Sequence, residues 1–267
     1  MADASERERI SSRNLSPHRK KMPFAVHCGD FFTTFVALNR SITHKLTIMK
    51  NRVFLNLIGI ALSVVAFTMC KSQSAVVPTT PEEALTELIA GNERYVSEKC
   101  IHPHGDMERV EETAPHQAPF AAVVGCSDSR VPVELLFDQG IGDIFVIRTA
   151  GNNVNSEMVM GSVDYAIEHL GVKLLLVLGH GSCGGVTGAI SECGEEHGNI
   201  GHLLGTIRND VSDYVGKPEA LDAAIHHHTQ VQVERIIAYP HVAEKIAKGE
   251  LMVKKAHYDV KSGKVTF

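Results

Sequence analysis

Residues 121–132, Ala-Ala-Val-Val-Gly-Cys-Ser-Asp-Ser-Arg-Val-Pro, decide how this chain folds. Their first four residues are small or branched and apolar, which predicts a buried strand. A thiol, a carboxylate and a guanidinium follow at once, those of Cys126, Asp128 and Arg130. Buried strands rarely end in three reactive groups, so the stretch indicates a functional site at the end of this strand.

A second apolar run ends in the same way. Residues 173–179 (KLLLVLG) predict another buried strand, which runs directly into the glycine-rich segment HGSCGG. In an open parallel sheet, functional groups gather just past the carboxyl ends of the strands. If the two strands are neighbours, Cys126, His180 and Cys183 meet in one crevice. Two thiolates and one imidazole suit Zn²⁺, and three protein ligands leave a fourth position open, as in catalytic zinc sites.

Each cluster taken alone has an ordinary explanation. A single cysteine at a strand end is more often a small buried apolar residue, and His-x-x-Cys pairs occur by chance. Cys126 and Cys183 could also form a disulfide in an oxidising compartment. The conjunction favours a metal site, because both clusters follow strands, both are flanked by glycines, and Asp128 comes two residues after Cys126.

The rest of the chain alternates apolar runs with helical patterns. A helix over 82–95 follows a capping sequence, in which Thr80 precedes Pro81 and Glu83 lies three residues on. The other predicted elements are strands over 120–125, 143–149, 173–179, 251–260 and 264–267, helices over 132–137, 157–170 and 218–239, and a polar connector over 100–119. This alternation predicts an α/β fold, a mostly parallel β-sheet flanked by helices, with an N-terminal helical arm and a C-terminal edge strand. We expect residues 76–267 to form one domain.

The front of the chain differs in charge from the rest. Residues 1–75 carry 11 Lys and Arg against 4 Asp and Glu, whereas 76–267 carry 15 against 27. An acidic body is a poor partner for nucleic acid or an anionic membrane surface. Residues 49–75 place a cationic segment before an apolar run and then small residues, the order of a secretory signal peptide. A buried helix or a membrane anchor is the alternative, but the run is short and interrupted for a span.

We therefore expect export to the periplasm, with no stable membrane span in the mature form. Residues 1–48 precede Met49, an internal methionine, and show no clear periodicity, so we interpret them as a non-native or disordered extension. A lipid anchor at Cys70 is not favoured, because Met69 is bulkier than the residue that such processing uses.

The paired motifs resemble those of the β-class carbonic anhydrases. Cys126-Ser-Asp128-Ser-Arg130 and His180-x-x-Cys183 are similar to that family's two metal-site signatures. Further similar segments are FDQGIGD (137–143), FVIRTAGN (145–152), SVDYAIEHLG (162–171), the arm around AGNERY (90–95) and the end of the chain (258–265). The resemblance covers the chain from about residue 80 onward.

The resemblance implies a zinc enzyme that interconverts carbon dioxide and bicarbonate. One Zn²⁺ per subunit would be held by Cys126, His180 and Cys183, and a hydroxide formed on it would attack carbon dioxide. Two thiolates cancel the zinc charge and acidify the water less than imidazoles would, so we expect an alkaline activity profile. The resemblance also implies a homodimer or homotetramer whose subunits embrace through the N-terminal helices.

The family also implies roles around the metal. In an open form Arg130 holds Asp128 by its planar fork, and Asp128 orients the hydroxide. In a closed form Asp128 itself takes the fourth zinc position, and the sequence does not choose between the two. Gln139 would offer its amide to bicarbonate, often across the dimer interface, and Gly184 a backbone N–H.

Rival functions stay open on the same residues. Relatives of this fold hydrolyse carbon disulfide or carbonyl sulfide, and the metal site alone does not separate them. A non-catalytic zinc-binding protein would lose the Asp128–Arg130 pair, which is present, and a disulfide-stabilised binding protein would have no metal. The run 226–228 (His-His-His) lies within a predicted helix, where its members point in different directions, and we expect a solvated face. Cys100 and Cys193 are left over, either as a disulfide or as free thiols.

Overall fold

The computed structural model describes residues 77–191 and 197–267. The chain divides into two compact units, Met1–Gln73 and Ser74–Phe267, and every described residue belongs to the second. The predicted extension (1–48) and signal peptide (49–75) lie outside the described residues. Among the residues that are described, no helix combines the length and the apolar character that a membrane span requires.

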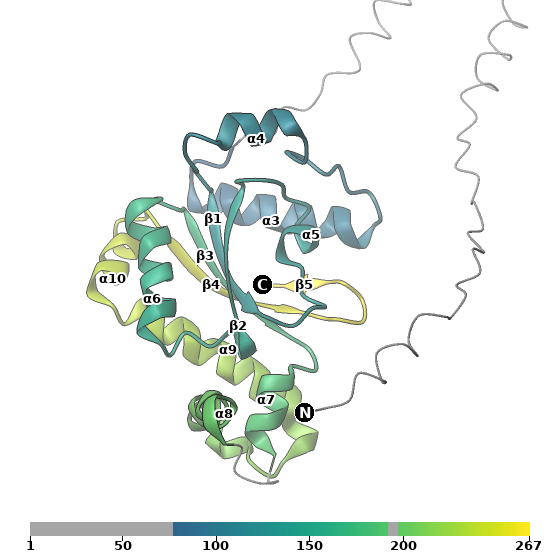
Figure 1. Cartoon of the computed structure of the whole chain (residues 1–267), viewed down its shortest axis with the longest axis vertical. Helices are drawn as coiled ribbons and strands as arrows, with labels where there is room; N and C mark the ends of the chain where they lie inside the picture. Colours follow the sequence, from purple (N-terminus) through teal and green to yellow (C-terminus); the bar gives the residue numbers. More distant parts are fainter. Residues whose placement is uncertain (1–76, 192–196) are drawn as a thin grey trace, which may run out of the picture. The chain divides into compact units, whose positions relative to one another are not determined.

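A five-stranded sheet forms the centre of the described unit (Figure 1). The strand order is β2-β1-β3-β4-β5, which are Ile144–Thr149, Ala121–Cys126, Leu174–His180, Met252–Tyr258 and Val265–Thr266. The first four strands pair in parallel, and only the short edge strand β5 is antiparallel. The predicted α/β fold with its mostly parallel sheet is confirmed.

Helices cover both faces of this sheet. Ala121 and Val123 of β1 lie in one core cluster and Ala122 and Val124 in the other, because side chains alternate along a strand. One cluster includes residues of α3 (Pro81–Val96) and α5 (Val133–Leu136), and the other includes residues of α6 (Glu157–Asp164), α9 (Leu221–Ile237) and α10 (Pro240–Ala247). Figure 1 shows the two groups of helices on opposite sides of the sheet. Covering both faces explains why β1 and β3 are buried throughout.

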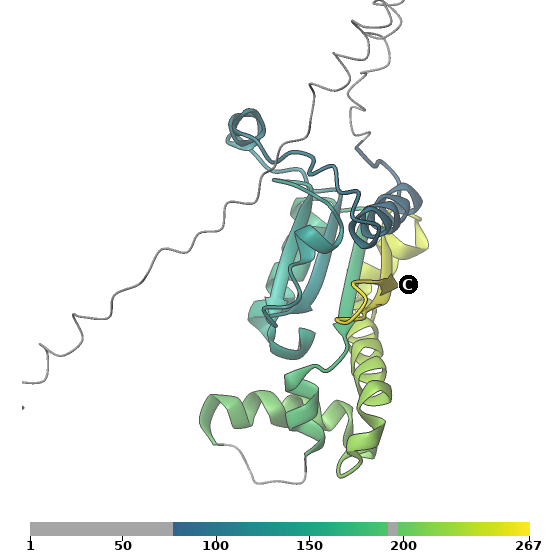
Figure 2. The same ribbon diagram turned by 90° about the vertical axis from the view of Figure 1, so that its right-hand side faces the viewer.

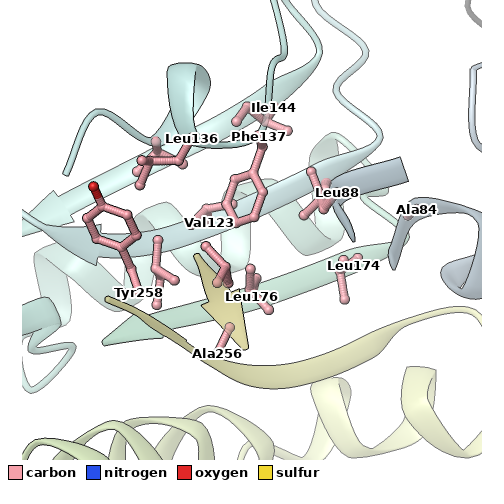
Figure 3. Packing of buried hydrophobic residues seen from close by; sticks show 14 of the residues in the cluster. Ala84, Leu88, Val123, Leu136, Phe137, Ile144, Leu174, Leu176, Ala256 and Tyr258 are labelled. Atoms are coloured by element: carbon pink, nitrogen blue, oxygen red, sulfur yellow. The ribbon is translucent and has the colours of Figure 1, made fainter. Parts of the chain in front are cut away.

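The core on the α3 side fixes the N-terminal arm (Figure 3). Leu88 of α3, Phe137, and the strand residues Val123 and Leu176 are all fully buried in it. Burying side chains of this size stabilises the fold by roughly 1.5–3 kcal/mol each. The arm is therefore an integral part of this domain.

Hydrogen bonds tie the same arm to the end of the chain. Thr80 and Glu83 form the predicted capping box at the start of α3. The Asn92 amide donates to the carbonyl oxygens of Leu136 and Gly263, both at 3.0 Å, and its oxygen accepts from the Val265 N–H at 2.8 Å. One buried side chain thus joins α3, α5 and β5.

Several helices differ from the sequence-based expectation. The predicted connector over 100–119 contains α4 (Met107–Thr113), because the Asp106 side chain caps it by accepting from the Arg109 N–H. The predicted helix over 157–170 is α6 followed by a π-helical turn, Tyr165–His169. The predicted helix over 218–239 is a 3₁₀ turn (Pro218–Ala220) and α9, and Pro240 then starts α10.

A third cluster of helices lies beyond the carboxyl ends of β1 and β3. It comprises α7 (Gly184–Ile190), α8 (Gly198–Asp210) and the first half of α9, around Ile207 and Ile225. Figure 2 shows α7 and α8 below the strand ends. Cys126 and Cys183 belong to this same cluster, so these helices cover the end of the sheet where the two motifs lie.

Candidate metal centre

The topology brings the two sequence motifs together. Cys126 is the last residue of β1 and His180 the last of β3, and the two strands are direct neighbours in the sheet. Cys183 caps the start of α7, three residues after His180. The ligand atoms of Cys126, His180 and Cys183 all lie within 4.8 Å of one another, and all three side chains are buried. The condition set by the sequence, that the two strands be neighbours, is met.

The two ring nitrogens of His180 differ in their contacts, because only one of them has a hydrogen-bond partner among the described residues. Its ring is fully buried, and Nδ1 lies 3.0 Å from the Gly181 carbonyl oxygen, to which it donates. Nε2 therefore carries the free lone pair. It has no hydrogen-bond partner within the described parts of the chain. An orphaned buried nitrogen facing two thiols is what a metal ion would satisfy, so these residues fit Zn²⁺.

In the metal-free protein the two neighbouring sulfur atoms differ in protonation: the pKa of Cys126 is lowered and that of Cys183 is raised. A hydrogen bond from Cys183 lowers the pKa of Cys126 to about 3, with a further contribution from His180. The Gly151 and Asp128 N–H groups also donate to the Cys126 sulfur, at 3.3 and 3.4 Å. The same bond to Cys126, together with burial, raises the pKa of the Cys183 thiol. Neither cysteine is part of a disulfide in this structure, so the structure gives no support to the disulfide alternative.

Asp128 and Arg130 form a bidentate ion pair at the edge of the cluster. Arg130 Nε and Nη2 donate to the two Asp128 carboxylate oxygens at 2.9 and 2.7 Å, and the Arg130 N–H donates to Oδ1 at 2.9 Å. These bonds hold the pKa of the Asp128 carboxyl well below its usual range. Asp128 Oδ2 also lies 4.0 Å from His180 Nε2. The structure thus has Asp128 held by Arg130, which corresponds to the open arrangement.

Arg148 was not singled out from the sequence as a site residue. From β2 its Nε donates to the Cys126 carbonyl oxygen at 3.0 Å, and its Nη2 donates to the Asp128 carbonyl oxygen at 2.7 Å. It thereby fixes the backbone on both sides of Ser127. A charged residue at the end of an otherwise apolar strand was the available signal.

A buried network behind the centre corrects the expected solvated histidine run. His227 is exposed, but His228 is fully buried. His228 Nε2 lies 2.8 Å from the Gly151 carbonyl oxygen, and its Nδ1 lies 3.0 Å from Asp210 Oδ2. Because α9 packs beneath the site, one of three consecutive helical residues necessarily faces inward. His228 therefore supports the residue whose N–H reaches Cys126.

The carboxylate of Asp210 is the anionic end of this network. Burial raises its pKa, but hydrogen bonds from His228, Arg235 and Gln232 outweigh burial and hold the pKa below its ordinary range. The Gln232 amide donates to Oδ2 at 2.8 Å, and Arg235 binds both carboxylate oxygens. A buried carboxylate is tolerated because every side of it is paired.

The two predicted substrate contacts lie in different settings. Gly184 opens α7 directly after Cys183, and a Cβ built there would meet no atom within 4 Å, so space remains beside the centre. The Gln139 amide instead donates to Glu87 Oε1 at 3.1 Å and to the Phe137 carbonyl oxygen at 3.0 Å. None of the hydrogen bonds described for Gln139 reaches the metal-site side chains of its own chain.

Fold and site together define a class of protein. A parallel α/β sheet carries a Cys₂His cluster at its carboxyl edge, beside a carboxylate held by an arginine, and this donor set is one that could hold a metal ion. The comparisons with known proteins identify the family. A family model described as carbonic anhydrase matches residues 121–265. Carbonic anhydrase 2 of Mycobacterium tuberculosis H37Rv is 37% identical over 199 residues, which are 70% of this chain and 92% of that protein. The chain belongs to the β-carbonic anhydrase family and is a carbonic anhydrase enzyme.

Further relatives agree with this assignment. Carbonic anhydrase of Pseudomonas aeruginosa is 35% identical over 164 residues, covering 57% of this chain and 74% of that protein. The solved Coccomyxa β-carbonic anhydrase in complex with acetazolamide superposes with a TM-score of 0.55 at 28% identity, over 68% of this chain and 85% of that one. The tetrameric β-carbonic anhydrases of Sordaria macrospora share the fold, with a TM-score of 0.55 at 23% identity, over 68% of this chain and 95% of that one.

Proposed function

We propose that this enzyme reversibly hydrates carbon dioxide to bicarbonate and a proton, with one Zn²⁺ per subunit held by Cys126, His180 and Cys183. The observation that carries the proposal is the convergence of two thiols on a buried imidazole nitrogen that has no other partner within the described residues. When bound, Zn²⁺ would supply Lewis-acid activation of water near neutral pH. The cluster of three protein ligands leaves room for that water.

Asp128 is the proposed catalytic carboxylate. It is ionised and close to the ligand atoms, 4.0 Å from His180 Nε2. A carboxylate in this position accepts a hydrogen bond from the attacking water and aims the water's lone pair at the substrate carbon. Arg130 is a positioning residue, because its fork and its N–H set the orientation of both carboxylate oxygens. We propose the open arrangement as the resting state.

Substrate binding is proposed to involve Gly184 and Gln139. The Gly184 backbone N–H lies at the start of α7, where helix N–H groups favour anions such as bicarbonate. Gln139 faces α3 and not the centre of its own chain, so its amide would reach substrate only in a partner subunit. This supports a homodimer or homotetramer, and the Sordaria macrospora proteins of the same fold are tetrameric.

Stopped-flow hydration of carbon dioxide by the purified protein, with metal analysis, tests this function. Cys183→Ser should lose zinc and activity together, whereas Asp128→Ala should keep zinc and lose turnover. Cys100→Ser is the matched control, because Cys100 is a free thiol outside the cluster. Zinc-replete protein without hydration from neutral to alkaline pH would overturn the proposal. Assays with carbon disulfide and carbonyl sulfide on the same preparation test the rival hydrolases.

We also propose export to the periplasm, on the support of the sequence order in residues 49–75 alone. N-terminal sequencing of the protein recovered from the periplasmic fraction should give a start near residue 76. Peptides from residues 1–48 in the native protein would contradict the proposal that those residues are not part of it.

A further inference from the structure

A second group of metal-binding side chains lies on α9 and β4. Asp222 and His226 are four residues apart on α9, one helical turn, and so share a face. His257 belongs to β4, where it pairs with Gly179 of β3. One ligand atom from each of these three residues lies within 4.8 Å of the other two.

The separations between the donor atoms are close to those of a coordinated ion. His226 Nε2 lies 3.8 Å from Asp222 Oδ2, and His257 Nε2 lies 3.9 Å from Asp222 Oδ1. Tetrahedral coordination with metal–ligand bonds near 2.1 Å requires about 3.4 Å between donors. Each of these pairs therefore needs to close by only about half an ångström.

The freedom of the side chains permits this closure. The His226 and His257 rings are stacked, with centroids 4.3 Å apart, so the His226 ring must turn out of the stack for both lone pairs to converge. The side chains of His226 and Asp222 are 44% and 77% exposed, and both can rotate, whereas His257 is 15% exposed and anchored in the sheet. The His257 imidazole is therefore fixed, and the side chains of Asp222 and His226 can move toward an ion bound to it.

The surroundings favour a cation. The three residues line an open surface hollow of about 560 Å³, together with Glu219, Asp259 and Lys261. Carboxylates outnumber cations there by three to one, counting Asp222. The hollow also borders Gly181 and Ser182, which directly follow His180. An ion bound there would be accessible from solvent, and neither Cys126 nor Cys183 lines the hollow.

We propose that Asp222, His226 and His257 bind a second divalent transition-metal ion, distinct from that of the Cys₂His centre. Two imidazole nitrogens with one carboxylate group, which turns a different oxygen toward each ring, select Zn²⁺, Ni²⁺, Co²⁺ or Cu²⁺ over Mg²⁺ and Ca²⁺, which prefer oxygen alone. Solvent supplies the remaining ligands. The ion links α9 to β4, and its binding requires nothing of the proposed hydration chemistry.

Calorimetric titration of the zinc-loaded full chain with Ni²⁺ tests this site. We expect one class of Ni²⁺ sites in the wild type that Asp222→Asn, His226→Gln and His257→Gln each weaken by at least about tenfold. His227→Gln is the matched control, because His227 is the exposed neighbour in the same run and packs against Tyr214. It should leave the affinity unchanged. Asp222→Asn and His226→Gln alter exposed side chains, so both variants should fold.

Two outcomes would overturn the proposal. One is Ni²⁺ binding that none of the three substitutions weakens, or that His227→Gln weakens as strongly. The other is a sulfur-to-nickel charge-transfer band in the absorption spectrum that grows with the heat of binding, which would assign the ion to Cys126 and Cys183. Absence of that band, together with loss of binding in the three variants, supports the site.

Discussion

Gly151→Ala tests the turn that donates a hydrogen bond to the Cys126 sulfur. Gly151 adopts φ = +69°, a left-handed conformation that costs a residue with a Cβ roughly 1–2 kcal/mol. A Cβ there would also lie 2.8 Å from Cδ1 of the fully buried Ile207, and such overpacking costs about 1–3 kcal/mol. Together these effects predict a loss of roughly 2–5 kcal/mol in the free energy of unfolding.

The assay is urea unfolding of metal-free wild type and variant at equal protein concentration, because bound metal and subunit association both shift apparent stability. Gly161→Ala is the matched control. Gly161 lies within α6, is exposed, and offers open space to a Cβ, so alanine there should stabilise the protein by about 0.5–1 kcal/mol.

A second measurement links this change to the metal centre. The Gly151 N–H donates to the Cys126 sulfur, and the Gly151 carbonyl oxygen is bound by His228. A displaced Gly151 should therefore weaken zinc binding, measured by competition with a chromophoric chelator, whereas Gly161→Ala should not. If the free energy of unfolding of Gly151→Ala lies within about 0.5 kcal/mol of the wild-type value and its zinc affinity is unchanged, a Cβ at this position does not strain the turn as argued.

Three further predictions follow from charges in and behind the site. Arg130→Gln should keep zinc and reduce kcat/KM for hydration by about 10–100-fold. This factor corresponds to the free energy of the side-chain hydrogen bonds from Arg130 to the Asp128 carboxylate that the substitution removes. The pKa of Asp128 would rise only toward its usual value near 3.9, so the reduction should be uniform above pH 6, and a loss confined to low pH would contradict the positioning role. The lowered pKa of Asp210 contributes stability above about pH 4 that is lost as the pH falls below it. Asp210→Asn should therefore be less stable at pH 7 by about 3–5 kcal/mol and should show a flatter stability curve between about pH 4 and 2, as followed by circular dichroism. Iodoacetamide at pH 7 should alkylate Cys126, whose pKa is lowered to about 3 in the metal-free protein, only after zinc is removed, whereas Cys100 should react equally in both states by peptide mass spectrometry.

The ends of β1 and β3 were predictable because two strong local signals coincide there. Apolar runs of this length predict buried strands. A reactive residue that directly follows such a run lies at the carboxyl edge of a parallel sheet. The sequence therefore predicts that Cys126 and His180 lie at the same edge of the sheet. The pairing of Asp128 with Arg130 was expected from the family resemblance, and the structure has it as a bidentate contact.

The supporting residues were less visible because their roles are decided by packing between distant elements. His228 is one of three identical neighbours, and only the seating of α9 on Gly151 selects it as the buried one. Helix α8 is rich in glycine and polar residues, so its sequence gives a weak helical pattern. The proposed role of Gln139 depends on a second copy of the chain, because within its own chain the amide donates to Glu87 and Phe137.

The strand order has a consequence for how the proposed metal site is assembled. Cys126 and His180 become neighbours only when β3 inserts beside β1, after the chain has passed through β2 on the far edge. Closing such a long loop is slow, and the ligands are far apart in earlier states. With the zinc ligands proposed above, the ion would bind only where β1 and β3 are already paired, because Cys126 and His180 end those two strands. The zinc content of the purified protein would accordingly measure the fraction of molecules in which these two strands are paired.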